Sequence, residues 1–240
     1  MNTAGITDIH GCDVSLYTCV LGGYLAGKNV SVAVRPEHAE FGWMTEYLTP
    51  GIDTTITVIL CTRYMQYIGR QEPYFTRMEQ AYRNSFNDLH RENKEKLQPL
   101  LDEIKIAGFF PMDAMEFIAH VPQDAVVLSF PPTYAGGYEK LYKNMDAVLE
   151  WDAPAYEVFT KESFEVFMRN IVERDTWVLA RDNRVEELEP YLVAQFQTGM
   201  RSRPVYMYAS KSEKTYLTMP RQKLEPVHQK RLTGDIEGPM

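Results

Sequence analysis

The sequence has few cysteines and no long hydrophobic run. Its three cysteines, Cys12, Cys19 and Cys61, are odd in number and lack the paired spacing of metal sites, so we expect reduced thiols and no metal. No stretch approaches the roughly 18 consecutive apolar residues of a membrane span, and no basic-then-apolar signal peptide opens the chain. We therefore expect a cytoplasmic protein that does not enter a membrane.

Common hydrolase and nucleotidase signatures are also absent. The sequence contains no G-x-S-x-G elbow and no Walker loop, and its five histidines include no pair four residues apart. These absences argue against a serine hydrolase, a P-loop enzyme and a zinc protease.

Basic residues are outnumbered, with 25 Lys and Arg against 33 Asp and Glu, which gives a net charge of −8. Nonspecific DNA affinity comes mainly from cations that neutralise phosphates, so a broad nucleic-acid surface is not expected. A DNA-binding protein with this balance needs local basic patches, for which Arg201, Arg203 and residues 211–214 are candidates. The negative net charge is also compatible with binding to a protein partner.

The composition predicts one sizeable folded domain. Hydrophobic residues make up 45% of the 240 residues and charged ones 24%, which is typical of globular proteins. After Thr218 the sequence turns to Pro, Lys, Gln and Gly. We therefore expect an α/β domain over residues 1–217 and an extended or flexible tail over 218–240.

Helical and strand patterns alternate along the chain, which favours an α/β sheet protein. The helical patterns cover residues 14–25, 72–107, 138–145, 161–173 and 184–196. The strand patterns cover residues 30–34, 54–60, 125–128, 176–180 and 205–209. Within 72–107 we expect a long helix or a helix pair, broken just before Pro99.

The run over residues 125–128 ends at a diproline. Its apolar, β-branched content predicts an interior strand that is covered on both faces. Pro131 and Pro132 cannot continue a central strand but can hold a short loop at its carboxyl end, where α/β proteins bind ligands. A strand-terminating turn packed by Tyr134 is the purely structural alternative.

This stretch resembles motif IV of the DNA amino-methyltransferases, (D/N/S)-P-P-(Y/F/W), and above all the adenine-N6 methylases. Ser129, Pro131, Pro132 and Tyr134 carry the resemblance, with Phe130 and Thr133 displacing the polar and the aromatic position by one each. In that family the polar residue accepts a hydrogen bond from the amino group of the flipped base, and the aromatic ring stacks on the base. The resemblance therefore implies these four residues as the catalytic site.

Two further segments resemble the cofactor motifs of the same family. Asp113 and Ala114 match the acidic and small pair that contacts the adenine of S-adenosylmethionine (SAM). Asp13 matches the carboxylate that binds the cofactor ribose at a strand end. Each aspartate also fits a helix N-cap, and that alternative stays open. If they bind one cofactor, both carboxylates must lie at the same edge of the sheet.

The order of these motifs is similar to that of antirestriction adenine methyltransferases of phages and mobile elements. The resemblance implies a three-layer Rossmann-like sandwich with a mostly parallel sheet, SAM as cofactor and DNA as substrate. It also suggests that the helical insertion at 72–107 recognises DNA, although an amphipathic packing helix is the favoured explanation for that segment. The glycine-rich cofactor loop expected before Asp13 is absent. Three explanations stay open: another cofactor contact, a loop supplied by a partner protein, or a fold that acts without catalysis.

Overall fold

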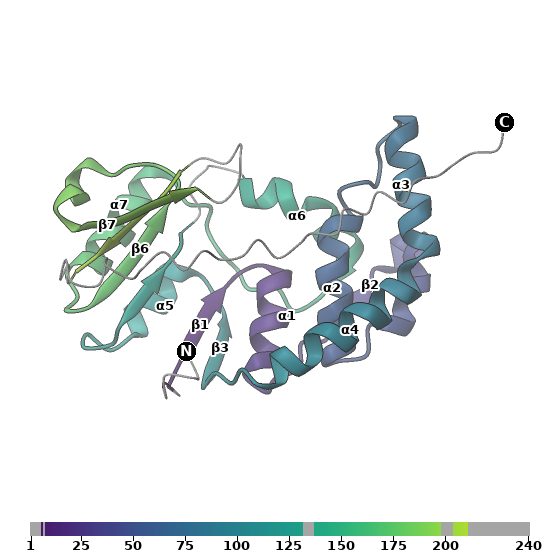
Figure 1. Cartoon of the computed structure of the whole chain (residues 1–240), viewed down its shortest axis with the longest axis horizontal. Coiled ribbons are helices and arrows are strands. Elements are labelled where there is room, and N and C mark those ends of the chain that lie inside the picture. Colours follow the sequence, from purple (N-terminus) through teal and green to yellow (C-terminus); the bar gives the residue numbers. More distant parts are fainter. Residues whose placement is uncertain (1–5, 7, 132–136, 198–203, 211–240) are drawn as a thin grey trace.

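The computed structural model describes residue 6 and residues 8–131, 137–197 and 204–210 (Figure 1). The strands are β1 His10–Asp13, β2 Ala33–Val34, β3 Gly108–Pro111, β4 Val127–Ser129, β5 Leu149–Glu150, β6 Trp177–Arg181, β7 Leu192–Gln197 and β8 Pro204–Ala209. The helices are α1 Leu16–Leu25, α2 Ile52–Tyr64, α3 Pro73–Asn84, α4 Phe86–Asp102, α5 Ala114–His120, α6 Gly137–Val148 and α7 Lys161–Val172, with 3-10 segments η2 Pro36–Tyr47 and η3 Glu186–Tyr191. The expected tail, 218–240, lies outside the described residues.

The described strands form three small sheets. β1 pairs with β3 in parallel, β2 pairs with β5 antiparallel, and the largest sheet has the order β4-β6-β8-β7. In that sheet only β4 and β6 are parallel, and β8 runs antiparallel to both neighbours. The chain is therefore mixed α/β as expected. A three-layer sandwich with a mostly parallel sheet is not confirmed.

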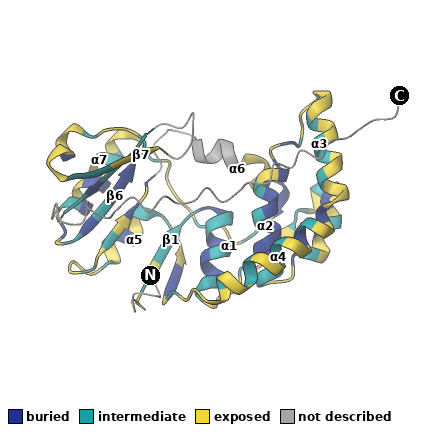
Figure 2. Cartoon of the chain, in the orientation of Figure 1, coloured by how far each residue is buried: buried dark blue, intermediate teal, exposed yellow. Residues whose placement is uncertain are grey.

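β4 lies at the edge of its sheet, so the prediction of an interior strand was wrong. Among the described residues β4 hydrogen-bonds only to β6. Val126, Leu128 and Phe130 lie on alternate positions and are 64%, 47% and 69% exposed. The apolar run therefore presents one face to solvent, whereas the neighbouring strand β6 is mostly buried (Figure 2). A continuous apolar run does not specify whether both faces are covered, and this ambiguity misled the prediction.

α1 packs directly on the β1–β3 pair. A Cβ atom at Gly22 would lie 2.1 Å from the ring of Phe109, so the helix approaches the strand only because this position has no side chain. The close approach fixes the turn between β1 and α1, where Asp13 lies.

α2 occupies residues for which the sequence predicted a strand, at 54–60. Most residues of the helix are buried, and β-branched residues lie on several of its sides, which hides the helical period. The Thr55 hydroxyl donates to the Gly51 carbonyl and the Thr57 hydroxyl to the Tyr47 carbonyl. These bonds satisfy hydroxyl groups that would otherwise be buried without partners.

The predicted helical segment 72–107 is the pair α3 and α4. Their break falls at Ser85, which ends one helix and begins the next, and Pro99 lies within α4 instead of at the break. Phe86 of α4 is buried against Ile56 and Leu60 of α2, so this face of α4 is a packing face. No helix in the described part of the chain is long and apolar enough to span a membrane.

α5 and α7 cover one face of the four-stranded sheet. Ile118 of α5 and Ile171 of α7 pack with Trp177 and Leu179 of β6. The helix predicted at 184–196 is instead η3 followed by β7, because Pro190 stops the helix and the next residues pair with β8. The helix at 161–173 and the strands at 176–180 and 205–209 are confirmed within a residue.

Candidate functional site

Asp13 and Asp113 lie at the same edge of the β1–β3 pair. The register places Asp13 opposite Pro111, so Asp113 follows two residues beyond that edge. The Met112 N–H donates to the Asp13 carbonyl at 3.3 Å and holds the two segments together. The prediction that both aspartates share one edge of the sheet is therefore confirmed.

This edge continues to β6 and β4. The Glu157 N–H, a few residues before α7, donates to the Asp113 carboxylate at 3.3 Å. In the first turn of α7, the Phe164 ring contacts Arg181, the last residue of β6. Since β4 is parallel to β6, its last residue, Ser129, lies at the same end. The carboxyl ends of four strands thus face one side of the molecule, which is where open α/β sheets bind ligands.

The Asp13 carboxylate is engaged by the backbone of the turn that follows it. One oxygen accepts from the Val14 N–H at 2.7 Å and from the Ser15 N–H at 2.9 Å. The N-cap of α1 is Ser15, whose hydroxyl accepts from the Thr18 N–H. The N-cap alternative for Asp13 is therefore wrong, and Asp13 instead orders the turn that precedes the cap.

Asp113 is the N-cap of α5, which confirms the structural alternative for this residue. One of its oxygens accepts from the Met115 N–H at 2.7 Å, and the other accepts from the Glu157 N–H. Ala114 is the first residue of the helix. A carboxylate offers about four lone-pair sites, so a capping role leaves Asp113 able to accept from a ligand as well.

Ser129 ends β4 and is buried, with 7% of its surface exposed. No hydrogen bond of its hydroxyl is found within the described residues. Pro131 follows and is also buried. Pro132 and Tyr134 lie outside the described residues, so the structure brings together Ser129 and Pro131 but says nothing of the other two predicted catalytic residues.

Cys12 directly precedes Asp13 in β1, and the sequence predicts no more for it than a reduced thiol. Burial, and then the negative charges of Asp13 and Asp113, raise the pKa of the Cys12 thiol to about 12. Cys12 is therefore a reporter of the electrostatic field that the two carboxylates create. Its half-buried position leaves it open to small reagents.

Replacing Asp113 with asparagine is expected to lower the Cys12 pKa and to speed its alkylation. Removing one of two nearby carboxylates makes the thiolate less unfavourable, so the ionised fraction and the alkylation rate should rise on the order of a few-fold. Asparagine caps helices as well as aspartate, so α5 should persist. The rate is measured with iodoacetamide and peptide mass spectrometry.

Cys61 is the internal control for this variant. Its pKa is raised to about 12 by burial alone, with no contribution from Asp113, so its slow alkylation should not change. An unchanged Cys12 rate in Asp113→Asn would contradict the proximity of the Asp113 charge to Cys12.

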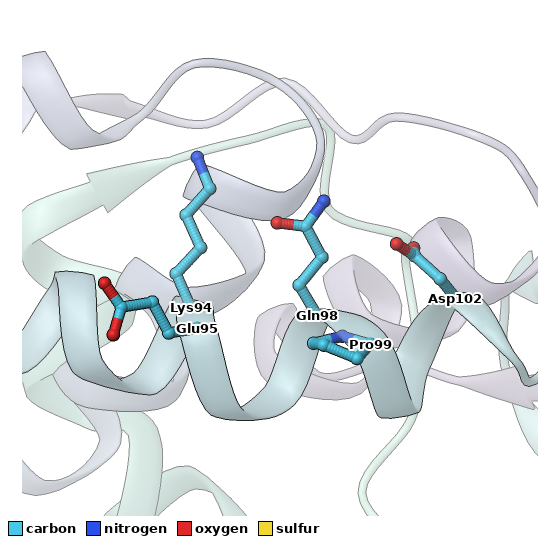
Figure 3. A pocket seen from close by; sticks show the side chains of 5 residues that line it. All are labelled: Lys94, Glu95, Gln98, Pro99 and Asp102. Atoms are coloured by element: carbon cyan, nitrogen blue, oxygen red, sulfur yellow. The ribbon is translucent and has the colours of Figure 1, made fainter.

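The hollow seen in Figure 3 lies away from this edge. It has a volume of about 380 Å³ and is lined by Lys94, Glu95, Gln98, Pro99 and Asp102, all from α4. Side chains from one helix make a surface depression and cannot enclose a ligand. No cluster of His, Cys, Asp and Glu suited to a metal ion occurs in the part of the chain that the structure describes.

A family model described as Phage DNA Adenine Methylase-like domain 1 matches residues 2–232, nearly the whole chain. No curated protein and no solved structure matches the chain significantly. The matched range includes β1, β3, β4 and β6, the strands whose carboxyl ends form the candidate site.

Proposed function

Because the chain belongs to the phage DNA adenine methylase-like family, we propose that it transfers a methyl group from SAM to the N6 amino group of adenine in DNA. The observation that carries the proposal is the shared edge. Asp13 and Asp113 lie at the ends of β1 and β3, and Ser129 ends β4 on the same side. Cofactor and base contacts can then be made from one side of the molecule.

Ser129 is the proposed acceptor for the amino group of the target base. An aromatic amine is a poor nucleophile, and a hydrogen-bond acceptor fixed beside it helps only where charge develops on the nitrogen. Ser129 is held by β4 before it and by the buried Pro131 after it. We assign Pro132 to the same rigid frame and Tyr134 to stacking on the extruded base.

The residues at β1 and β3 fit the cofactor in part. SAM supplies a methyl group on a sulfonium, which is electrophilic without any metal. We propose that Asp13 accepts from the ribose hydroxyls and that Asp113 and Ala114 contact the adenine. Glycine is missing from the turns after β1 and β3, and positive φ angles occur in the described residues only at Gly27, Gly51 and Gly69. Without glycine at these turns, the side chains there keep the backbone from approaching the cofactor closely.

The test is methyl transfer from isotopically labelled SAM to adenine-containing DNA. We expect slow transfer and weak SAM binding by calorimetry. Two or three missing backbone hydrogen bonds, at roughly 1 kcal/mol each, lower affinity by one to two orders of magnitude or more. DNA in which N6-methyladenine replaces every adenine is the matched control. Transfer to that control at the same rate would rule out N6 as the acceptor.

A second candidate function is an antirestriction or binding protein that uses this fold without catalysis. The edge position of β4 favours it, because among the described residues no strand pairs with the outer side of β4, and the exposed Leu128 and Phe130 offer a surface for an added strand. Absence of transfer by the wild type, alone or with a partner protein that supplies a glycine loop, would favour this alternative.

A further inference from the structure

Arg181 is a buried cation at the carboxyl end of β6. Only 8% of its surface is exposed. Its guanidinium lies over the ring of Phe164, 3.6 Å from the ring centre, in the first turn of α7. An aromatic face attracts a cation but does not accept the hydrogen bonds of its N–H groups. Arg181 therefore keeps donors that the ring cannot satisfy.

No hydrogen bond or ion pair of the Arg181 guanidinium is found among the described residues. Its Nε is buried without an acceptor. Burial lowers the pKa of Arg181, and the neighbouring Asp182 and Tyr208 offset this only in part. Burying a charge without a partner is costly in folding free energy. The chain thus buries a cation whose Nε has no hydrogen-bond acceptor.

Two other arginines differ from Arg181. Arg174 is equally buried, but its guanidinium donates to three backbone carbonyls. Arg184, only three residues further along, is exposed and paired with Glu189. The Nε of Arg174 also lacks an acceptor, but of these three arginines only Arg181 is buried with no hydrogen bond of its guanidinium found among the described residues.

Arg181 lies beside the proposed base acceptor. Leu179 pairs with Ser129, and residues paired in parallel strands point to the same face of a sheet. Arg181 is two residues beyond Leu179, so its side chain points to the same face of the sheet as the side chains of Leu179 and Ser129. At this position along the sheet the neighbouring segment is the start of the diproline loop. Asp13, in contrast, ends β1, and Asp113 follows β3, and these two strands lie outside this sheet.

We propose that the Arg181 guanidinium binds a phosphate of the DNA strand next to the adenine held at Ser129. This rests on the proposed function, because it takes DNA as the substrate. A guanidinium presents a planar fork of donors that matches phosphate oxygens, and in a buried site such charge-assisted bonds are strong. Phosphate is favoured over the cofactor carboxylate because the proposed cofactor residues lie on β1 and beyond β3, whereas Ser129 is on the strand next to Arg181.

The test uses a single-stranded oligonucleotide of about 12 nucleotides with one adenine, in which no base pair must be opened. Arg181→Met should weaken its binding by about tenfold to a hundredfold, as expected for charge-assisted hydrogen bonds. Neutral methylphosphonates beside the adenine should weaken the wild type by a similar factor and Arg181→Met no further. Arg184→Met is the matched control and should bind like the wild type.

Thermal unfolding separates a binding role from a packing role. Removing an unpaired buried cation should leave the melting temperature of Arg181→Met unchanged or higher. A lower melting temperature with unchanged oligonucleotide affinity would mean that Arg181 only packs on Phe164, and would overturn the inference. The inference would also be overturned if Arg181→Met lost affinity for SAM but not for the oligonucleotide. It would be overturned as well if the wild type did not bind the oligonucleotide. Binding that depends on Arg181 without any methyl transfer would uphold this inference and contradict the proposed catalysis.

Discussion

Ser129→Ala is expected to lower methyl-transfer turnover by about a hundredfold while leaving the melting temperature unchanged. The serine hydroxyl matters most where charge develops on the amino nitrogen, and removing one preorganised hydrogen-bonding group costs about 10²-fold to 10³-fold in turnover. Since the contact strengthens toward the transition state, KM for DNA should change little. The fold should persist, because no hydrogen bond of the Ser129 hydroxyl is found in the described part of the chain.

Two matched variants sharpen this test. Ser129→Asn restores the amide acceptor found at the polar position of motif IV and should recover part of the turnover. Tyr134→Ala should also lower turnover, whereas Tyr134→Phe keeps a ring that can stack on the base and should retain most of it. Rapid methyl transfer by both alanine variants would refute the assignment of these residues to the site.

Arg174→Met is expected to destabilise the fold by about 3 kcal/mol, the largest loss we expect from a single replacement. The guanidinium donates to the carbonyls of Pro122, Ile118 and Val121, at 2.7, 2.8 and 3.2 Å. Ile118 lies in the last turn of α5, Val121 is its C-cap, and Pro122 follows the cap. Methionine fills the volume but removes all three charge-assisted bonds, and the Ile118 and Pro122 carbonyls keep only their backbone donors, the Val121 and Ala125 N–H groups.

The loss is measured by urea unfolding, with Arg169→Met as the control. Arg169 lies on the exposed face of α7, and replacement of a surface residue usually changes stability by less than about 0.5 kcal/mol. Unchanged stability of Arg174→Met would contradict the bonds to α5. Arg181→Met is expected to keep or gain stability. Of two equally buried arginines, only Arg174 should therefore lose stability on replacement by methionine.

The site predictions that the structure confirms concern residues at the ends of helices and strands. Asp113 and Ala114 mark the start of α5, and Asp13 marks the end of β1, because capping and turn chemistry depend on neighbours in the chain. The serine at the end of β4 follows from the diproline in the same way. These positions could be placed at strand ends without knowing how the strands pair.

Properties that depend on distant neighbours could not be predicted. The field at Cys12 comes partly from Asp113, about a hundred residues later, and Arg181 is buried by Phe164 of another element. Residues 54–60 were predicted as a strand because threonine and isoleucine favour strands. In the structure they lie in α2, where most of them are buried. β4 was placed in the sheet interior because an apolar run does not reveal whether a second neighbour pairs with it.

In the proposed function, the hydrogen bond from the Glu157 N–H to Asp113 couples the cofactor site to the DNA site. A ligand group that competes for this Asp113 oxygen weakens the bond to Glu157, which holds the chain just before α7. The first turn of α7 carries Phe164, which covers Arg181. Occupancy at Asp113 would then change the freedom of the guanidinium, and by linkage an anion at Arg181 would change the affinity at Asp113 by the same factor. Cofactor and DNA would thus bind as coupled ligands.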